Sequence, residues 1–169
     1  MQYRFIESPV GSLLLAGKLH AGKTDVLHFV GFPEGKGKFF PEDHWREVDG
    51  SFTQAEDQLN EYFEGRRQVF ELKLQPSGTP FQLQVLTALQ EIPFGETRSY
   101  LEIARSIGRP KAVRAVGAAN GRNPLPIVIP CHRVIGTNGS LTGFGGGLAA
   151  KAYLLGLERG GFSLTPPRI

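Results

Sequence analysis

A four-residue connector, Gln75-Pro76-Ser77-Gly78, divides the chain into two parts with different hydrophobic patterns. Before it, short apolar runs separated by Gly, Pro and Ser are typical of strands in a meander; these runs are residues 3–7, 12–16, 26–30 and 69–74. Apolar residues at helical spacing predict one helix that ends at Gly65; they are Phe52, Ala55, Leu59, Tyr62 and Phe63. We therefore expect a small sheet-plus-helix domain before the connector.

The chain after the connector carries signals for helices instead of strands. Capping-box patterns at Thr79 and Ser99 predict two helix starts, because each residue is followed three positions later by Gln or Glu. Apolar spacing predicts further helices over residues 111–120 and 148–158. The fold class expected for the whole chain is α+β, with a mainly helical second domain. The predicted segments are an N-terminal domain, a connector and a C-terminal domain: 1–74, 75–78 and 79–169.

A turn and a local charge excess mark the middle of the second domain. The helix that begins at Ser99 is expected to end at Gly108, and Pro110 prevents it from continuing. Two short helices joined in this way are typical of a helix-turn-helix, although an ordinary helical hairpin shows the same pattern. Residues 98–122 contain six Arg or Lys and one Glu, so this segment carries +5, whereas the whole chain carries +3. Such a basic patch favours DNA binding.

The composition excludes several classes of protein. The one cysteine, Cys131, excludes an internal disulfide and a zinc site built from several cysteines. No apolar run reaches the roughly 18 residues of a membrane span, and no signal peptide is evident, so a cytoplasmic location is expected. The glycine-rich loop 136–147 has no Lys at the spacing of a phosphate-binding loop. We predict no metal and no cofactor.

Cys131 stands in a setting that suits a nucleophile. The apolar run 127–129 predicts a short β-like segment, and Pro130 would place Cys131 at its end. A free thiol is mostly protonated at neutral pH and needs a base or a positive neighbour. We expect His132 to act through a bridging water, to be oriented by Glu158, and so to lower the pKa of the thiol.

Residues 79–158 resemble the O6-alkylguanine-DNA alkyltransferases, also called methylated-DNA–protein-cysteine methyltransferases. The signature is Ile127-Val128-Ile129-Pro130-Cys131-His132-Arg133-Val134, and other matching segments are 95–100, 110–117, 123–126 and 143–148, with Lys151. Residues 1–74 resemble the family's N-terminal domain more loosely. The resemblance implies DNA repair: the alkyl group of O6-alkylguanine, and of O4-alkylthymine, passes irreversibly to Cys131, once per chain.

The resemblance also implies how DNA is held. The recognition helix would enter the minor groove, and Arg114 would fill the stack after the target nucleotide flips out. Small side chains on this helix let its backbone approach the groove closely. The implied DNA contacts are Ala112, Val113, Arg114, Ala115, Gly117 and Arg133. The partner expected is double-stranded DNA of any sequence, bound by a monomer, with cooperative binding left open.

Further roles follow from the same resemblance. Tyr100 would donate a proton or hydrogen bond to guanine N3, and Asn123 would brace the active-site turn; both join Cys131, His132 and Glu158 as catalytic residues. The implied substrate pocket consists of Pro126, Val134, Phe144, Gly145 and Lys151. Two of these depart from relatives. Phe144 stands where many relatives carry Tyr and so lacks the hydroxyl, and Gly145 stands where some carry Ser and opens space beside O6.

Three other functions fit parts of the sequence. A lesion sensor that binds alkylguanine without removing the alkyl group would resemble this chain, but such proteins replace the cysteine. A helix-turn-helix regulator with Cys131 as a redox sensor predicts operator preference and a dimer. A cysteine hydrolase would turn over, whereas a thioether has no route back to the thiol.

Overall fold

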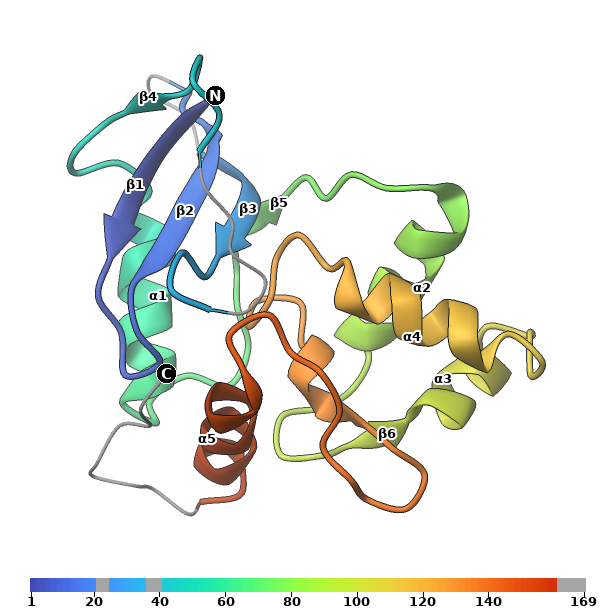
Figure 1. Ribbon diagram of the computed structural model, residues 1–169. Helices are drawn as coiled ribbons and strands as arrows, with labels where there is room; N and C mark the ends of the chain where they lie inside the picture. The colour runs from blue at the N-terminus through green and yellow to red at the C-terminus, as the bar shows by residue number, and fades with distance from the viewer. Residues whose placement is uncertain (21–24, 36–40, 161–169) are drawn as a thin grey trace.

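The N-terminal part of the protein is a twisted sheet covered by one helix (Figure 1). A computed structural model describes residues 1–20, 25–35 and 41–160. The strands are β1 (Gln2–Ile6), β2 (Leu13–Lys18), β3 (Val26–Gly31), β4 (Arg46–Glu47) and β5 (Lys73–Leu74), in the order β4-β1-β2-β3-β5. β1, β2 and β3 form an antiparallel meander, and the short strands β4 and β5 pair in parallel with its two edges. The three predicted strands of the meander are confirmed to within two residues.

Helix α1 (Thr53–Phe63) covers one face of this sheet. Its apolar side chains belong to the same buried cluster as the inward side chains of β2, including Leu13 and Leu15. Arg4 on β1 makes two hydrogen bonds of 3.1 Å to the carboxylate of Glu56, which fixes the helix against the strand. The predicted apolar stripe is confirmed for Ala55, Leu59, Tyr62 and Phe63, which are all buried.

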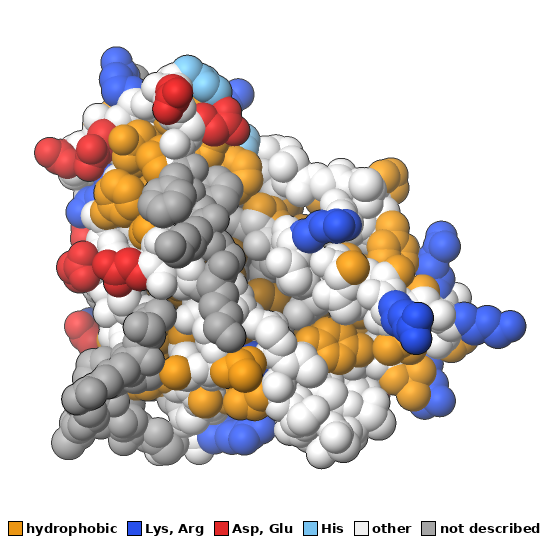
Figure 2. All heavy atoms as spheres, viewed as in Figure 1, with side chains coloured by type: hydrophobic (Ala, Val, Ile, Leu, Met, Phe, Trp, Pro, Cys, Tyr) orange, Lys and Arg blue, Asp and Glu red, His pale blue; other side chains and the backbone are white. Residues whose placement is uncertain are grey.

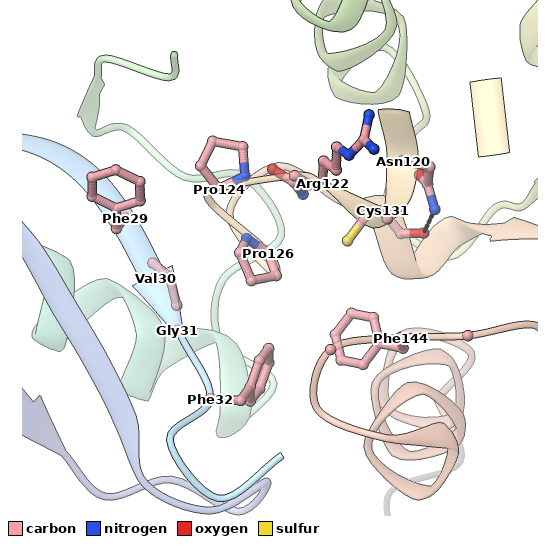
Figure 3. Close-up of a pocket in the computed structure, with 14 residues that line it drawn as sticks. Phe29, Val30, Gly31, Phe32, Asn120, Arg122, Pro124, Pro126, Cys131 and Phe144 are labelled. Atoms are coloured by element: carbon pink, nitrogen blue, oxygen red, sulfur yellow. Dashed lines mark hydrogen bonds between the residues drawn. The ribbon is translucent and has the colours of Figure 1, made fainter. Parts of the chain in front are cut away.

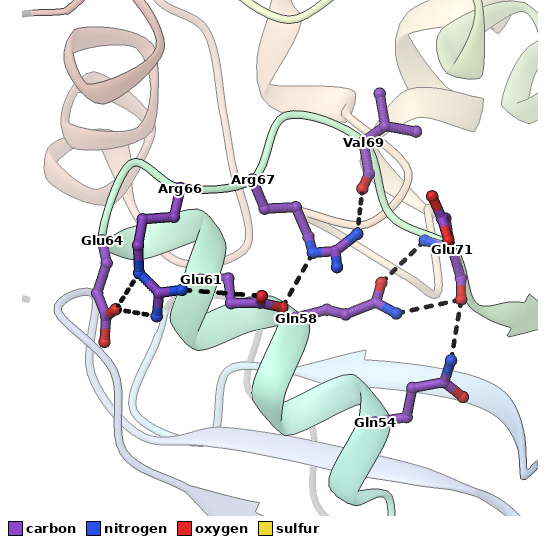
Figure 4. Close-up of polar contacts among 8 residues, drawn as sticks. All are labelled: Gln54, Gln58, Glu61, Glu64, Arg66, Arg67, Val69 and Glu71. Atoms are coloured by element: carbon purple, nitrogen blue, oxygen red, sulfur yellow. Dashed lines mark hydrogen bonds and ion pairs between the residues drawn. The ribbon is translucent and has the colours of Figure 1, made fainter.

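The strand predicted over residues 69–74 is wrong for most of its length, because only β5 forms there. The backbone of Glu71 is instead paired with the side chain of Gln58 on α1 (Figure 4). Its N–H donates to Gln58 Oε1 at 2.8 Å, and its carbonyl accepts from Nε2 at 3.2 Å. Arg67 reinforces the segment by donating to Glu61 and to the carbonyl of Val69. These groups are therefore not available for a β ladder.

The C-terminal part is mainly helical. Its elements are α2 (Pro80–Gln90), β6 (Arg98–Ser99), α3 (Tyr100–Ser106), α4 (Val113–Gly121), η1 (Cys131–Arg133), β7 (Val134–Ile135) and α5 (Leu148–Glu158). Both predicted capping boxes are confirmed: Thr79 and Gln82 exchange hydrogen bonds at the start of α2, and Ser99 and Glu102 at the start of α3. The parallel pair β6–β7 was not predicted, and it joins the segment before α3 to the segment after Cys131.

Two short helices, α3 and α4, pack against each other and against α2. The chain leaves α3 at Gly108, whose φ of 75° suits glycine because it lacks a Cβ. Basic side chains gather over these helices, whereas acidic side chains gather over the sheet domain (Figure 2). The exposed basic residues of this region are Arg105, Arg109, Lys111, Arg114 and Arg122. None of the helices in the described ranges has the length and apolar character required to cross a membrane.

Candidate active site

Cys131 follows a tight turn, so the β-like run predicted before it is wrong. The backbone of this segment pairs with itself, because Ile129 N donates to Leu125 O at 2.8 Å and Cys131 N donates to Ile129 O at 2.8 Å. Ile127 has a φ of 75°, a conformation that β-branched residues rarely adopt. Cys131 therefore begins the 3-10 helix η1 instead of lying at a strand end.

This strained turn is braced from both sides. The Asn123 side chain bridges it, since Nδ2 donates to Ile129 O at 2.8 Å and Oδ1 accepts from Leu125 N at 2.9 Å. On the other side, the backbone N–H of Val30 on β3 donates to Pro124 O at 2.9 Å. The turn that presents Cys131 is thus held by a side chain of its own segment and by the N-terminal sheet.

Cys131 lies at the edge of a pocket of about 270 Å³ between the two parts of the chain (Figure 3). Its side chain is almost buried, with a relative exposure of 5%. Pro126, Phe144 and Gly145 line the pocket with it, as the family resemblance implies. The opposite wall comes from β3 and the residue after it, where Phe32 packs edge-on against Phe144 with ring centroids 5.3 Å apart. The pocket is therefore mainly apolar and aromatic, although Asn and Arg side chains also reach it.

Burial raises the pKa of the Cys131 thiol to about 11, although a hydrogen bond from Asn123 and the positive charge of Lys151 act in the opposite direction. The expectation that the thiol's pKa is lowered is wrong for the free protein. The desolvation penalty for a buried thiolate exceeds the stabilisation that Asn123 and Lys151 provide. The thiol is protonated at neutral pH, so its reaction as a nucleophile requires a base.

The candidate base is His132, which is fully buried beside Glu158. Nε2 of His132 lies 2.6 Å from Oε2 of Glu158, and Nδ1 has no hydrogen-bond partner among the described residues. Burial lowers the pKa of His132, which keeps the ring neutral at neutral pH. Burial acts to raise the pKa of Glu158, but hydrogen bonds from His132 and Arg133 hold it at about 2. The pair can orient a neutral imidazole and stabilise it once it is protonated.

Arg133 lies inside the protein, so its prediction as a DNA contact is wrong. Its Nε donates to Glu158 Oε1 at 2.7 Å, Nη2 donates to Oε2 at 3.0 Å, and Nη1 donates to the carbonyl of Ile92 at 2.7 Å. Its guanidinium also lies 5.8 Å from the ring centroid of Phe94. A side chain with these partners cannot reach a phosphate without leaving a carboxylate buried and unneutralised.

Lys151 and Val134 support the pocket from behind. Nζ of Lys151 donates to the carbonyl of Val134 at 2.7 Å and to the carbonyl of Thr142 at 3.3 Å. Burial lowers the pKa of Lys151, and the neighbouring Cys131 acts to raise it. Neither Lys151 nor Val134 is a lining residue of the pocket at Cys131. Lys151 therefore ties the glycine-rich loop to β7, directly after η1, and brings a positive charge near the sulfur.

Tyr100 borders a second pocket that adjoins the first. Gly143, Phe144 and Gly145 line both, and so does Asn120. The Tyr100 hydroxyl is hydrogen-bonded to Oγ1 of Thr142 in the glycine-rich loop. The two pockets together form a continuous concavity between α4 and this loop, with the thiol on one side and the phenol on the other.

The outer face of α4 is exposed and has little bulk. Arg114 and Ala115 are exposed, and Ala112, Val113 and Gly117 are half-buried. Gly117 lies beside Tyr100, since a Cβ added there would come within 3.8 Å of the Tyr100 ring. Arg114 is therefore a long side chain projecting from a surface of small ones. Over the same described residues, no group of three or more His, Cys, Asp or Glu side chains could hold a metal ion.

Comparisons with known proteins cover both parts of the chain. The family model of the 6-O-methylguanine DNA methyltransferase DNA-binding domain matches residues 80–160, and that of the ribonuclease-like domain of the same proteins matches residues 1–76. The chain belongs to the 6-O-methylguanine DNA methyltransferase family. Its α+β class, with a sheet domain followed by a helical domain, is that of the family.

Individual family members are similar over nearly their whole length. The methylated-DNA–protein-cysteine methyltransferase of Methanosarcina acetivorans is 52% identical, over 94% of this chain and 98% of that protein. The one from Mycobacterium tuberculosis is 49% identical, over 94% and 93%. A crystal structure of Mycobacterium tuberculosis OGT in complex with DNA superimposes with a TM-score of 0.88 at 48% identity, over 98% of this chain and 97% of that one.

Several residues of this methyltransferase site were missed by the sequence reasoning. Phe29 and Phe32 line the pocket from the N-terminal part, and Asn120 donates from Nδ2 to the carbonyl of Cys131 at 3.4 Å. Tyr62 donates its hydroxyl to Glu158 at 2.6 Å. They lay in segments predicted only as strand, helix or loop, because a hydrophobic pattern does not show which residues meet across two domains.

Proposed function

We propose that this protein repairs DNA by moving the alkyl group of O6-alkylguanine onto Sγ of Cys131, irreversibly and once per chain. The names of its relatives and the shared family support a methylated-DNA–protein-cysteine methyltransferase. The observation that carries the proposal is a single cysteine at an apolar pocket, next to a buried His132–Glu158 pair. O4-alkylthymine offers the same kind of O-alkyl carbon and is proposed as a second substrate.

The reaction is a displacement at the alkyl carbon. The S–C bond forms while the bond from carbon to O6 breaks, and its electron pair stays with the guanine. Because the Cys131 thiol is protonated, its proton has to leave as sulfur attacks, and His132 Nδ1 is the proposed acceptor through a bridging water. Glu158 stabilises the resulting imidazolium. The base leaves as ordinary guanine after it takes up one proton, and the protein keeps a thioether.

Tyr100 is proposed to assist the leaving base. Its hydroxyl borders the pocket that adjoins the thiol, and its partner Thr142 Oγ1 can donate to the phenol oxygen, which leaves the phenol proton available for a base. A hydrogen bond from Tyr100 to guanine N3 would reduce the negative charge that develops on the base. This is electrostatic stabilisation that grows along the reaction.

DNA is the proposed partner, bound through α4 and the basic surface around it. The target carbon lies inside a base pair, so the nucleotide has to be flipped out. The small residues Ala112, Ala115 and Gly117 suit close approach to the minor groove, and Arg114 is placed to fill the stack. Val113, on the same helix, borders the pocket that holds Tyr100. Binding of this kind follows the phosphates and needs no particular sequence.

Intact mass measurement tests the proposal directly. The protein is incubated with duplex DNA that contains one O6-methylguanine, and Cys131→Ser serves as the control. We expect wild type to gain one methyl group per chain and then stop, while the variant gains none but still binds the DNA. Binding without any gain of mass in wild type would support a lesion sensor. Sustained loss of methyl groups from DNA beyond one per chain would support a hydrolase.

A further inference from the structure

The carboxylate of Glu158 on α5 is surrounded by donors from three other parts of the chain. Oε2 accepts from Tyr62 Oη at 2.6 Å, from Arg133 Nη2 at 3.0 Å, and lies 2.6 Å from His132 Nε2. Oε1 accepts from Arg133 Nε at 2.7 Å and from the backbone N–H of Gly95 at 3.4 Å. Glu158 lies on α5, His132 and Arg133 on η1, Gly95 in the loop after α2, and Tyr62 on α1. Only Tyr62 belongs to the N-terminal part.

The packing of the Tyr62 ring in the protein interior fixes the orientation of its hydroxyl. Its side chain is fully buried, and its ring packs against Phe63, Phe70 and Phe94 at centroid distances of 5.4, 5.4 and 6.2 Å. Burial first, and then the charge of Glu158, raise the pKa of Tyr62 well above its usual range. The phenol is therefore protonated, and a hydrogen-bond donor, at neutral pH.

We propose that Tyr62 is a positioning residue for the reaction: by donating to Oε2, it fixes the carboxylate of Glu158 against Nε2 of His132 and leaves Nδ1 as the free acceptor. The inference rests on the proposed alkyl transfer. It assigns the N-terminal domain a role in the reaction, because this domain supplies Tyr62, one of the groups that orient the general base His132. Tyr62 is not among the residues that line the substrate pocket, and its hydroxyl bonds to Glu158, so it would act on the reaction through Glu158 and His132.

Loss of the hydroxyl has a defined electrostatic consequence. Oε2 of Glu158 would lose the hydrogen bond from Tyr62, which partly offsets its negative charge. The carboxylate would then stabilise protonated His132 more strongly, so the imidazole would be a stronger base. The other charged or titratable groups near the pair are Arg133, Lys151 and Tyr153, and they remain in place. His132 would then be protonated up to a higher pH. A protonated ring cannot accept the thiol proton, so the acid limb of the reaction would move upward.

The test compares Tyr62→Phe with wild type and with Tyr153→Phe. The Phe variant keeps the aromatic ring, and Tyr153→Phe removes a hydroxyl from α5 that makes no hydrogen bond to Glu158. Transfer from free O6-benzylguanine is followed in single turnover from about pH 5 to 9. We expect the acid limb of Tyr62→Phe to move up by on the order of one pH unit, with unchanged substrate affinity. Tyr153→Phe should follow wild type.

A second readout does not depend on activity. In protein with ¹⁵N-labelled histidine, the titration of His132 should move to higher pH in Tyr62→Phe and stay unchanged in Tyr153→Phe. If wild type transfers no alkyl group from O6-benzylguanine or from O6-methylguanine in duplex DNA, the proposed function fails, whatever the titration shows. If wild type transfers it but neither the rate profile nor the titration moves in Tyr62→Phe, the positioning role is wrong.

Failure of Tyr62→Phe to fold would still leave a test on wild type. The Tyr62 hydroxyl proton should then exchange slowly and show a nuclear Overhauser contact to the His132 ring. A fast-exchanging proton without that contact would overturn the proposal.

Discussion

Arg133 holds both carboxylate oxygens of Glu158, with Nε 2.7 Å from Oε1 and Nη2 3.0 Å from Oε2. Planar, two-point pairing of this kind is the strong form of an arginine–carboxylate interaction. It also neutralises the charge that Glu158 brings into the interior, where an unpaired carboxylate would be costly. The arginine next to the catalytic pair is therefore part of the pair's support.

Arg133→Gln should destabilise the protein without weakening DNA binding by its folded form. The variant leaves Glu158 buried with its cation removed, which typically costs about 3–5 kcal/mol. Urea unfolding measures this loss, and binding of unmodified duplex is measured at a temperature where the variant is folded. Arg105→Gln, at an exposed position on α3, should show the reverse: stability close to wild type and weaker binding. Equal losses of affinity in both variants would return Arg133 to the DNA-binding surface.

Stability should fall in acid because of Glu158. Its pKa is about 2 in the folded protein and about 4.5 when unfolded, so the folded form gains stability above pH 4.5 and loses it as the pH falls toward 2. The shift corresponds to as much as about 3 kcal/mol. Unfolding free energies between pH 6 and 2 should therefore drop steeply for wild type. Glu158→Gln should start lower and show a smaller slope, and a slope equal to that of wild type would contradict the assignment.

Arg114→Ala should slow repair of duplex DNA but not the reaction with a free base. Extruding a nucleotide costs a few kcal/mol, and a side chain that fills the stack offsets part of this cost. Each 1.4 kcal/mol lost corresponds to roughly a tenfold lower rate. The measurement compares single-turnover rates on O6-methylguanine duplex and on free O6-benzylguanine.

Arg114→Lys is the matched control for this prediction, because it keeps the charge but not the planar group that can stack and pair. Full recovery of duplex repair by Lys would reduce Arg114 to a phosphate contact. An equal loss on both substrates would instead indicate a defect in the active site or in the fold.

Gly145→Trp should block transfer of a benzyl group while some methyl transfer remains. Gly145 lines both pockets, and a Cβ added there meets its nearest neighbour, Phe32 Cδ2, at 3.7 Å, which is an ordinary contact. The backbone can therefore accept a side chain, and an indole would occupy space needed by a large alkyl group. Gly145→Ala is the control and should react with both substrates. Rejection of O6-benzylguanine by wild type would show that the pocket is smaller than we infer.

The neighbouring glycine gives a useful contrast. A Cβ on Gly146 would lie 2.8 Å from Phe32 Cε1, so even Ala requires the aromatic ring or the loop to move. Effects of substitutions at Gly146 would therefore mix packing with chemistry, and they do not test the volume of the pocket.

Local signals in the sequence were sufficient for most of the helices. The capping boxes at Thr79 and Ser99 act within one turn of helix, and both are present as predicted. The apolar spacing on residues 148–158 predicted α5 with its observed bounds. The strands of the meander followed from runs bounded by turn residues. These features depend on neighbours in the chain, so a single sequence can show them.

Features that depend on distant partners were not predictable in this way. Glu71 leaves the strand pattern because Gln58 pairs with its backbone, and Ile127 adopts a positive φ inside a buried turn. Arg133 was expected to contact DNA because the family resemblance implied it. Its burial depends on Glu158, which lies 25 residues away in the sequence. Tyr62 lies 96 residues from the same carboxylate, and its apolar neighbours gave no sign of a polar partner.

The hydrogen bond from Val30 N–H to the carbonyl of Pro124 joins the N-terminal sheet to the turn that holds the thiol, so we expect the two to open together. Opening of the sheet edge at β3 would release the turn that holds Cys131, and loosening of the turn would expose the edge. Amide hydrogen exchange at Val30 should therefore proceed at the same rate as at Leu125 and Ile129, through the same opening event. An isolated C-terminal fragment would lack the hydrogen bond from Val30, so the turn before Cys131 could change conformation and the cysteine could shift.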